Sequence, residues 1–373
     1  MRLESAILLT LSFVIPSGVR AATGTEAASF LEIPVGAEPA AMGGAYSALA
    51  TNAYAPIYNP AGLGFAPSTQ LAGQHLAYLE SIHFEYMSFI HPLEQGKALG
   101  VSMQYLGSGD MAQTNDSGQQ TGNFSSHFAA YTLAYGQELN DKLALGIAAK
   151  WINAKISDVG SNAYAADAGI LMRASEKLTL AGVMSNAGTK LTFLDDGGSL
   201  PLLGRLGAAY EVTPQLRLSA DGIYRAYGLA SGHVGAEWRP VPMVALRAGY
   251  RTDTTKELGV MAGVTAGMGL TLWGQEFSYA WLPMGDLGMT QYFSLLLKFG
   301  EEAREKRNLI QYHTIRSIRS VNRTTIKEGS GRDVLQETTV REEDPEYQQL
   351  MQLLSDNDHE LFAHTLTSSV QAQ

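Results

Sequence analysis

Between residues 70 and 300 the chain repeats one pattern, in which segments of about 9 to 13 residues alternate large apolar side chains with small or polar ones and end in a turn. Successive side chains of a β-strand point to opposite faces, so each segment has one apolar face and one polar face. In one segment, Leu218 and Ala220 alternate with Arg217 and Asp221. The pattern predicts antiparallel β-structure, as either a soluble sandwich or a membrane barrel whose apolar faces meet lipid.

The turns divide this region into about fourteen strands, an even number of the kind that closed bacterial barrels have. We expect them at residues 69–79, 82–91, 97–107, 123–136, 142–155, 162–173, 177–187, 202–212, 215–226, 231–239, 243–252, 256–266, 269–282 and 288–300.

Loop lengths favour the membrane barrel over the sandwich. A long connection at 107–122 is followed by a tight one at 139–142, and an intermediate one at 157–161 by a tight one at 175–177. Outer-membrane barrels have short periplasmic turns and longer external loops, whereas a sandwich has no reason to sort its loops in this way. The first connection, near Glu80, is an exception because it is short and falls on the external side. The alternation places both ends of the barrel on the periplasmic side.

The N-terminus predicts export. A basic residue, an apolar run of about ten residues and small residues before Ala22 form a signal peptide over 1–21, and the run is too short to span a membrane as a helix. The chain has no cysteine, which excludes both disulfides and a lipoprotein anchor. Its net charge of -10 gives no support for nucleic acid as a partner.

Two further segments flank the barrel, which we place at 69–300. Residues 22–68 are rich in Gly, Ala and Pro and do not alternate, so they are not barrel wall. Residues 301–373 have a much higher charge density and form a soluble tail, expected to be partly helical after Asp344. We therefore expect a protein of the outer membrane with its tail in the periplasm.

The stretch from Val35 to Ala50, continuing from Ala55 to Leu63, resembles the opening of the PorV/PorQ family, within the FadL-like group of outer-membrane β-barrels. The resemblance implies a barrel of fourteen strands whose N-terminal segment folds into the lumen as a plug or hatch. Small residues suit close packing against an inner wall, and Asn-Pro suits a turn. The candidate plug motif comprises Met42, Gly43, Gly44, Asn59, Pro60, Ala61 and Gly62.

A second candidate group is the set of charges on the predicted inner faces of neighbouring strands: Arg205, Arg217, Asp221, Glu237, Arg247 and Arg251. They are interpreted as a mutually paired ladder that fills the lumen, or alternatively as a lining selective for an anionic substrate. His75, His83 and His91 are evenly spaced and could share a lumen face, but lumen histidines need no ligand role, so no metal site is predicted. No catalytic motif or cofactor site is recognisable.

Three functions remain open. The first is a PorV-like, non-enzymatic role in protein secretion or envelope assembly, which by resemblance involves secretion-system subunits or exported cargo. The second is a FadL-like channel for hydrophobic small molecules such as fatty acids or hydrocarbons. The third is an anchor whose periplasmic tail binds another envelope component.

Overall fold

A computed structural model describes residues 26–78, 81–93, 96–194, 196–226, 230–255 and 259–300, together with 324–330 and 334–340. The predicted signal peptide and the helix predicted after Asp344 lie outside these residues. The chain divides into two units, Met1–Phe299 and Gly300–Gln373, which are described separately.

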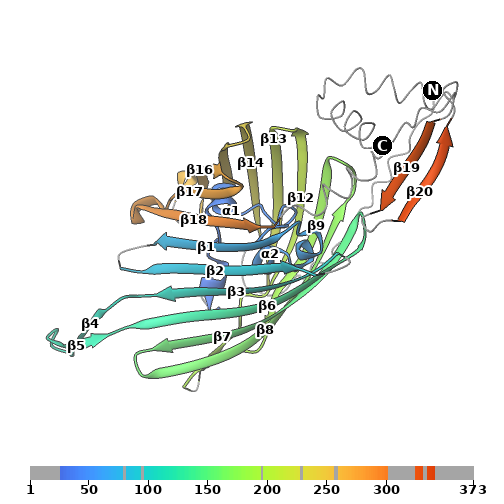
Figure 1. Cartoon of the computed structure of the whole chain (residues 1–373). Helices are drawn as coiled ribbons and strands as arrows, with labels where there is room; N and C mark the ends of the chain where they lie inside the picture. The colour runs from blue at the N-terminus through green and yellow to red at the C-terminus, as the bar shows by residue number, and fades with distance from the viewer. Residues whose placement is uncertain are drawn as a thin grey trace. The chain divides into compact units, whose positions relative to one another are not determined.

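The first unit is a closed antiparallel barrel of fourteen strands, as the alternation predicted (Figure 1). Around the barrel each strand neighbours the next in chain order, and the last pairs with the first. The strands are β1 (Thr69–Ala77), β2 (His83–Pro92), β3 (Lys97–Gly107), β6 (Ser126–Asn140), β7 (Leu143–Ile156), β8 (Val159–Arg173), β9 (Leu178–Gly188), β12 (Leu203–Thr213), β13 (Leu216–Arg225), β14 (Ser231–Val241), β15 (Val244–Arg251), β16 (Val264–Leu272), β17 (Gln275–Pro283) and β18 (Met289–Phe299).

Closure is achieved between β1 and β18. The two strands pair without a register shift from Thr69 opposite Phe299 to Ala77 opposite Gln291. Because hydrocarbon offers no partner for a backbone N–H or C=O, a sheet can cross a membrane only when no edge is left open. The pairing of β1 with β18 removes the two edges that an open sheet would have.

The two ends of the barrel differ in their connections. At one end, called the short-turn end, the connections are residues 93–96, 141–142, 174–177, 214–215, 242–243 and 273–274. At the other, the long-loop end, they include 108–125, 189–202 and 252–263. The first of these holds the hairpin β4 (Met111–Thr114) and β5 (Gln120–Phe124), and the second holds β10 (Leu191–Phe193) and β11 (Asp196–Gly198).

Two sequence predictions about connections were wrong. The link between β7 and β8 is a tight turn at residues 157–158, with Ser157 at a positive φ of 53°, and not an intermediate loop. The strands predicted at 256–266 and 269–282 are displaced, because the turn lies at Trp273-Gly274, where both φ angles are positive. Residues 267 and 268, which the prediction left between two strands, belong to β16, and Gly267 faces inward, where a Cβ would lie 2.6 Å from the Cβ of Ala41.

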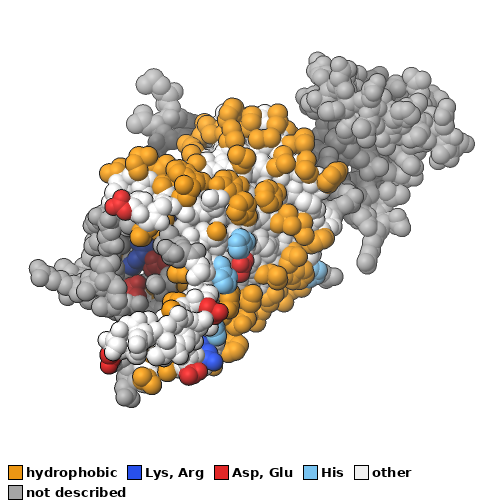
Figure 2. Space-filling model, turned by 90° about the vertical axis from the view of Figure 1, so that its left-hand side faces the viewer, with side chains coloured by type: hydrophobic (Ala, Val, Ile, Leu, Met, Phe, Trp, Pro, Cys, Tyr) orange, Lys and Arg blue, Asp and Glu red, His pale blue; other side chains and the backbone are white. Residues whose placement is uncertain are grey.

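The outer face of the barrel is largely apolar. Along β13 and β14, Leu218 and Val234 are 42 % and 51 % exposed, while their neighbours Ser219 and His233 point inward and are buried. Figure 2 shows hydrophobic side chains spread over much of one side of this wall. Within the described residues, no helix has the length and apolar character needed to cross a bilayer.

Residues 26–68, called the N-terminal segment, form short helices: η1 (Ser29–Glu32), α1 (Ala37–Ala41), α2 (Ala55–Tyr58) and η2 (Pro60–Phe65), of which η1 and η2 are 3-10 helices. The segment lies between opposite walls of the barrel (Figure 1). Helix α1 contacts β15 to β18, whereas η2 contacts β2, β3, β6, β7 and β8. Almost every residue from Val35 to Phe65 is buried.

The second unit contains one described hairpin, β19 (Thr324–Ser330) paired with β20 (Val334–Val340). The sequence did not predict these strands. Each strand is only seven residues long and lies in a segment of high charge density, so it gives a weak strand signal.

The outer face generates a first prediction. Val234→Arg places a charge on the apolar wall and should lower the free energy of unfolding by about 2–4 kcal/mol in a lipid bilayer. Leu287→Arg is the control, because Leu287 is 57 % exposed but lies in the connection between β17 and β18. Equilibrium unfolding of refolded barrels in vesicles measures the free energy of unfolding of both variants. An equal loss in Val234→Arg and Leu287→Arg would contradict the lipid-facing assignment of Val234 on β14.

Candidate functional site

The interior of the barrel is where the candidate residues meet. The turn after α1 approaches the wall through its backbone: Thr265 Oγ1 on β16 donates to the carbonyl of Ala41 at 2.8 Å and accepts from the N–H of Gly43 at 3.0 Å. Gly43 has a φ of 65°, and a Cβ there would lie 2.9 Å from the backbone N of Tyr250. Only glycine combines this backbone conformation with this approach. The motif residues Met42, Gly43 and Gly44 are all buried.

Asn59 joins the second part of the motif to the wall. Its Nδ2 donates to the carbonyl of Ser47 at 3.1 Å and to that of Ile170 on β8 at 3.2 Å. Its Oδ1 accepts from the N–H of Ala61 at 3.1 Å and caps η2, whose first residue is Pro60. Proline suits this position because the first N–H of a helix has no partner within the helix. Gly62 lies so close to the carbonyl of Ala50 that a Cβ would overlap it.

Wall glycines accommodate the N-terminal segment from the other side. A Cβ on Gly146 of β7 would lie 2.2 Å from the backbone of Pro60 and Ala61, and one on Gly249 of β15 would lie 2.2 Å from the N of Gly43. Sequence reasoning missed these residues. Their signal is a glycine at an inward position of an alternating strand, which can be recognised only once the register is known.

One charged cluster fixes α1 near the short-turn end. The guanidinium of Arg247 on β15 donates to Glu237 of β14 at 2.8 Å and to Glu276 of β17 at 2.5 Å. It also lies 3.7 Å from Glu38 of α1. Arg239 pairs with Glu237 at 3.0 Å and Glu276 at 3.3 Å. Three carboxylates therefore surround two guanidinium groups, and the cluster links three strands of the wall to the N-terminal segment.

A second cluster is centred on Asp221 of β13. Its carboxylate accepts from the N–H of Tyr46 at 3.2 Å, from the N–H of Ser47 at 3.1 Å and from Ser47 Oγ at 2.8 Å. Arg205 of β12 pairs with Asp221 at 3.3 Å and donates to the carbonyl of Gly44 at 3.1 Å. A buried carboxylate holding two backbone N–H groups and an arginine is well compensated for its loss of water. Asp221 thus fixes the middle of the N-terminal segment to the wall.

A third cluster lies toward the long-loop end. Arg225 pairs with Glu32 of the N-terminal segment at 2.7 Å and with Asp253 at 3.0 Å, and Arg251 pairs with Asp253 at 2.6 Å. Burial alone would raise the pKa of Asp253, but its contacts with His233 and Arg251 hold that pKa well below its usual range. The loop carboxylate therefore stays ionised and binds both guanidinium groups.

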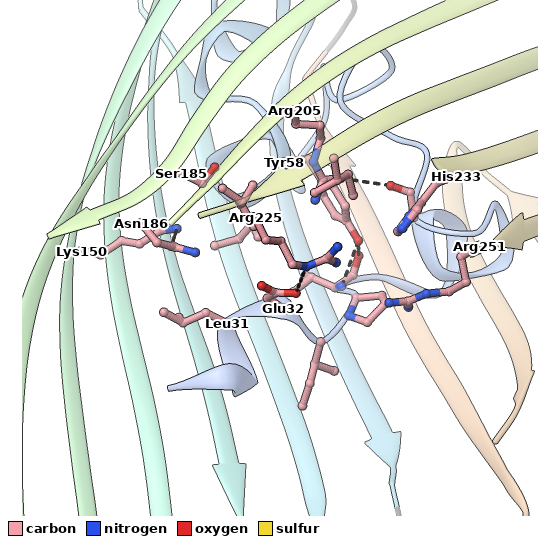
Figure 3. A pocket seen from close by; sticks show the side chains of 17 residues that line it. Leu31, Glu32, Tyr58, Lys150, Ser185, Asn186, Arg205, Arg225, His233 and Arg251 are labelled. Atoms are coloured by element: carbon pink, nitrogen blue, oxygen red, sulfur yellow. Dashed lines mark hydrogen bonds and ion pairs between the residues drawn. The ribbon is translucent and has the colours of Figure 1, made fainter. Parts of the chain in front are cut away.

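These side chains border a cavity of about 50 Å³ between the N-terminal segment and strands β7, β9 and β12 to β15 (Figure 3). Four basic side chains point toward this cavity, and each contacts an acidic side chain: Arg205, Arg225, Lys150 and His233. A space of this size holds water molecules rather than an organic substrate.

Lys150 belongs to a buried group that the sequence did not reveal. It pairs with Asp167 of β8 at 2.7 Å and donates to Asn186 Oδ1 at 2.7 Å. Asn186 has a φ of 62° and lies where the pairing of β8 with β9 shifts register. The group supplies hydrogen-bond partners at the point where the ladder between these two strands is interrupted.

The structure places the predicted inner-face charges as follows. Five of the six point inward and pair with other side chains: Arg205, Asp221, Glu237, Arg247 and Arg251. The sixth, Arg217, lies at the short-turn end, where it is 40 % exposed and pairs with Glu211 at 3.3 Å. Every arginine of this set has an acidic partner. The arrangement leaves no ring of free positive charge in the described part of the lumen.

The three histidines do not share a lumen face, although their even spacing in the sequence allowed it. On β1 and β2 the buried residues include Gln74, Phe84 and Ile90. The opposite parity makes His75, His83 and His91 point outward. The sequence pattern defined which residues share a face but not which face is inside. Among the described residues, no group of His, Asp and Glu has a metal-binding arrangement.

The family model of the type IX secretion system protein PorV matches residues 18–211, which include the whole N-terminal segment and the wall from β1 to most of β12. The chain belongs to the PorV family. The fold and the family together make it an outer-membrane β-barrel protein of the PorV type. No curated protein sequence matches it significantly.

Solved structures show the fold in other barrels. The toluene transporter TodX of Pseudomonas putida is 14% identical, with a TM-score of 0.50 over 70% of this chain and 96% of that one. The monoaromatic hydrocarbon channel CymD is 14% identical, with a TM-score of 0.51 over 72% and 98% of the two chains. A FadL homologue of Pseudomonas aeruginosa is 12% identical, with a TM-score of 0.47 over 71% and 98%. At these identities the likeness concerns the fold alone.

The close approach at Gly146 generates a second prediction. Gly146→Ala should lower the free energy of unfolding by about 1–3 kcal/mol, because the added Cβ pushes against the backbone of Pro60 and Ala61. Gly204→Ala on β12 is the matched control, since a Cβ there meets nothing within 4 Å. Urea unfolding of both variants measures the difference. An unchanged stability of Gly146→Ala would show that η2 does not pack against β7 as described.

Proposed function

We propose that this PorV-family protein acts in type IX secretion as a non-enzymatic docking protein of the outer membrane, which binds translocon subunits or exported cargo and does not conduct solutes. One observation carries the proposal. Three charged clusters and a series of wall glycines fix the N-terminal segment inside the barrel, with Arg247, Asp221 and Arg225 at their centres. In this proposal the N-terminal segment is a plug, and the motif residues Met42 to Gly44 and Asn59 to Gly62 attach it to the inner wall.

The wall supports a docking role over lateral release of a substrate. The pairings of β2 with β3 and of β3 with β6 continue without a register shift from one end of these strands to the other. The described irregularities lie at short turns, after Glu138, Glu211 and Trp238, and between β8 and β9. The last is held by the buried pair of Lys150 and Asp167 at 2.7 Å.

The long-loop end offers the surface for binding. Most side chains of its hairpin β4–β5 are polar and exposed, and in the turn Asn115 Oδ1 accepts from the N–H groups of Ser117 and Gln119 at 3.0 and 2.9 Å. In the proposed orientation the long-loop end is external and the short-turn end periplasmic. Residues 301–373 then continue from β18 into the periplasm, where they can bind a second envelope component.

A third prediction separates docking from conduction. The purified protein in planar bilayers should show no steady conductance, because the N-terminal segment fills the lumen. Deleting residues 29–65 should open a pore, provided that heat-modifiable migration on gels shows that the barrel has folded. Steady ion conductance by the intact protein would contradict the proposal.

A fourth prediction concerns partners. Replacing residues 111–124 with a short Gly-Ser linker should reduce co-purification of type IX cargo or translocon subunits, and replacing 285–288 in the same way should not. Truncation after Gly300 tests the tail separately, since it should remove only a periplasmic partner. Unchanged co-purification with both the hairpin and the tail removed would overturn the docking role.

The alternative is a channel for hydrophobic small molecules. It is favoured by a cavity of about 310 Å³ at the long-loop end, which is partly apolar and is lined by Phe30, Tyr78, Leu106, Leu282 and Tyr292, among others. The alternative requires uptake of an apolar probe such as toluene into vesicles that carry the intact protein. If the intact protein takes up toluene and Leu282→Arg blocks this uptake, the result supports the channel. If the intact protein takes up no toluene, the docking role is supported.

A further inference from the structure

The outer wall of β1 and β2 carries a hydrogen-bonded pair of polar side chains where an apolar surface is expected. His75 Nδ1 and Glu85 Oε1 are 2.7 Å apart, and their side chains are 56 % and 37 % exposed. Apolar side chains of β1, β2 and the neighbouring strands border the pair: Leu71, Met87, Met103, Phe293 and Leu295. Figure 2 shows histidine and acidic side chains together within a wall of hydrophobic ones. The two residues are called the His75–Glu85 patch.

The patch lies within the height of the apolar band. In a strand tilted by about 40°, the rise per residue along the barrel axis is about 2.5 Å. Counted from Thr69 and from Pro92 at the short-turn end, His75 lies about 15 Å up and Glu85 about 18 Å up, in the upper half of a band about 25 Å tall, and each is two residues from the long-loop end of its strand. Lipid chains at this depth offer no hydrogen-bond partner.

Half of the hydrogen-bonding capacity of the patch is unused. His75 Nδ1 and Glu85 Oε1 bind each other, whereas His75 Nε2 and Glu85 Oε2 have no partner among the described residues. An exposed ionisable pair in the lipid-facing wall is costly while these two atoms have no partner, and a second protein surface that covers the patch would remove that cost. The covering surface has to present both an acceptor for His75 and a donor for Glu85.

We propose that the covering surface is the same patch of a second copy of this chain. A two-fold dimer in a membrane has its axis along the membrane normal, so each group faces a group at its own height on the other copy. His75 and Glu85 lie on adjacent strands, directly opposite each other in the β1–β2 ladder and at nearly the same height. An axis between them brings each His75 opposite the other copy's Glu85. Each unused nitrogen then meets an unused oxygen, and four groups form a closed ring.

The shape of the wall beside the patch fits close contact. Gly73 lies between Leu295 and Met87 in the ladder, and a Cβ added to it would meet nothing within 4 Å. The absence of a side chain there leaves a groove of about 510 Å³, bordered by Phe277, Phe293 and Met103. The large apolar side chains of the second copy can enter this groove, so the interface combines a polar centre with an apolar border.

Cross-linking in the outer membrane tests the proposal, because a chain without cysteine gives no background. The full-length Gly73→Cys variant should form a homodimer with a short bismaleimide. Gly232→Cys should not, although Gly232 lies on the outer wall of β14 and is equally open. Adding His75→Leu and Glu85→Leu to Gly73→Cys should lower the dimer yield by about tenfold, with heat-modifiable migration showing that the barrel is folded.

Three results would overturn the dimer. Equal cross-linking at Gly73 and Gly232 would indicate random collision. Cross-linking of Gly73→Cys to a different protein, identified by mass spectrometry, would assign the patch to a hetero-partner. A monomer at all protein concentrations in membranes would show that lipid alone covers the patch. Because conduction and cargo binding are not measured here, failure of this proposal leaves the docking function untouched.

Discussion

Every other feature of the barrel depends on the backbone pairing of β1 with β18. A membrane-spanning sheet with an open edge would expose unpaired N–H and C=O groups to hydrocarbon, at a cost of several kcal/mol for each group. The ladder from Thr69–Phe299 to Ala77–Gln291 removes that cost and fixes a cylinder with a defined inside and outside. Once the inside exists, arginines and carboxylates can occupy it without meeting lipid, and the apolar half of each strand faces outward.

The interior resembles a protein core more than a channel. Its charges are grouped in clusters that join strands distant in sequence to one segment near the N-terminus, as Arg247 does with Glu38, Glu237 and Glu276. The glycines of the wall allow close packing of the N-terminal segment, and the ion pairs attach it to the strands. In the proposed docking role the loops, the tail and the outer wall remain for interactions, because residues of the N-terminal segment already contact the inner wall.

The sequence was most informative where a short period repeats. Alternation predicted fourteen strands, the apolar and polar faces of β13, and the different lengths of the loops at the two ends. It could not say which face of β1 and β2 is inside, because histidine and glutamine are compatible with either, so His75 was placed in the lumen. A glycine within a strand can also make room for a neighbouring side chain: Gly267, which the prediction left between two strands, lies within β16 and makes room for Ala41. Contacts such as Lys150 with Asp167 depend on long-range register and leave no local signal.

The fit between the wall and the N-terminal segment has a consequence for the order of assembly. The backbone of Pro60 and Ala61 lies so close to Gly146 that a Cβ on this glycine would clash with it. Gly43 is equally close to Gly249 on the opposite side of the barrel. A cylinder that had already shut would leave little room to thread such a segment into place. We expect the strands to wrap around the segment as they pair, so that the joining of β1 to β18 is the last step and the segment serves as the template on which the wall is built.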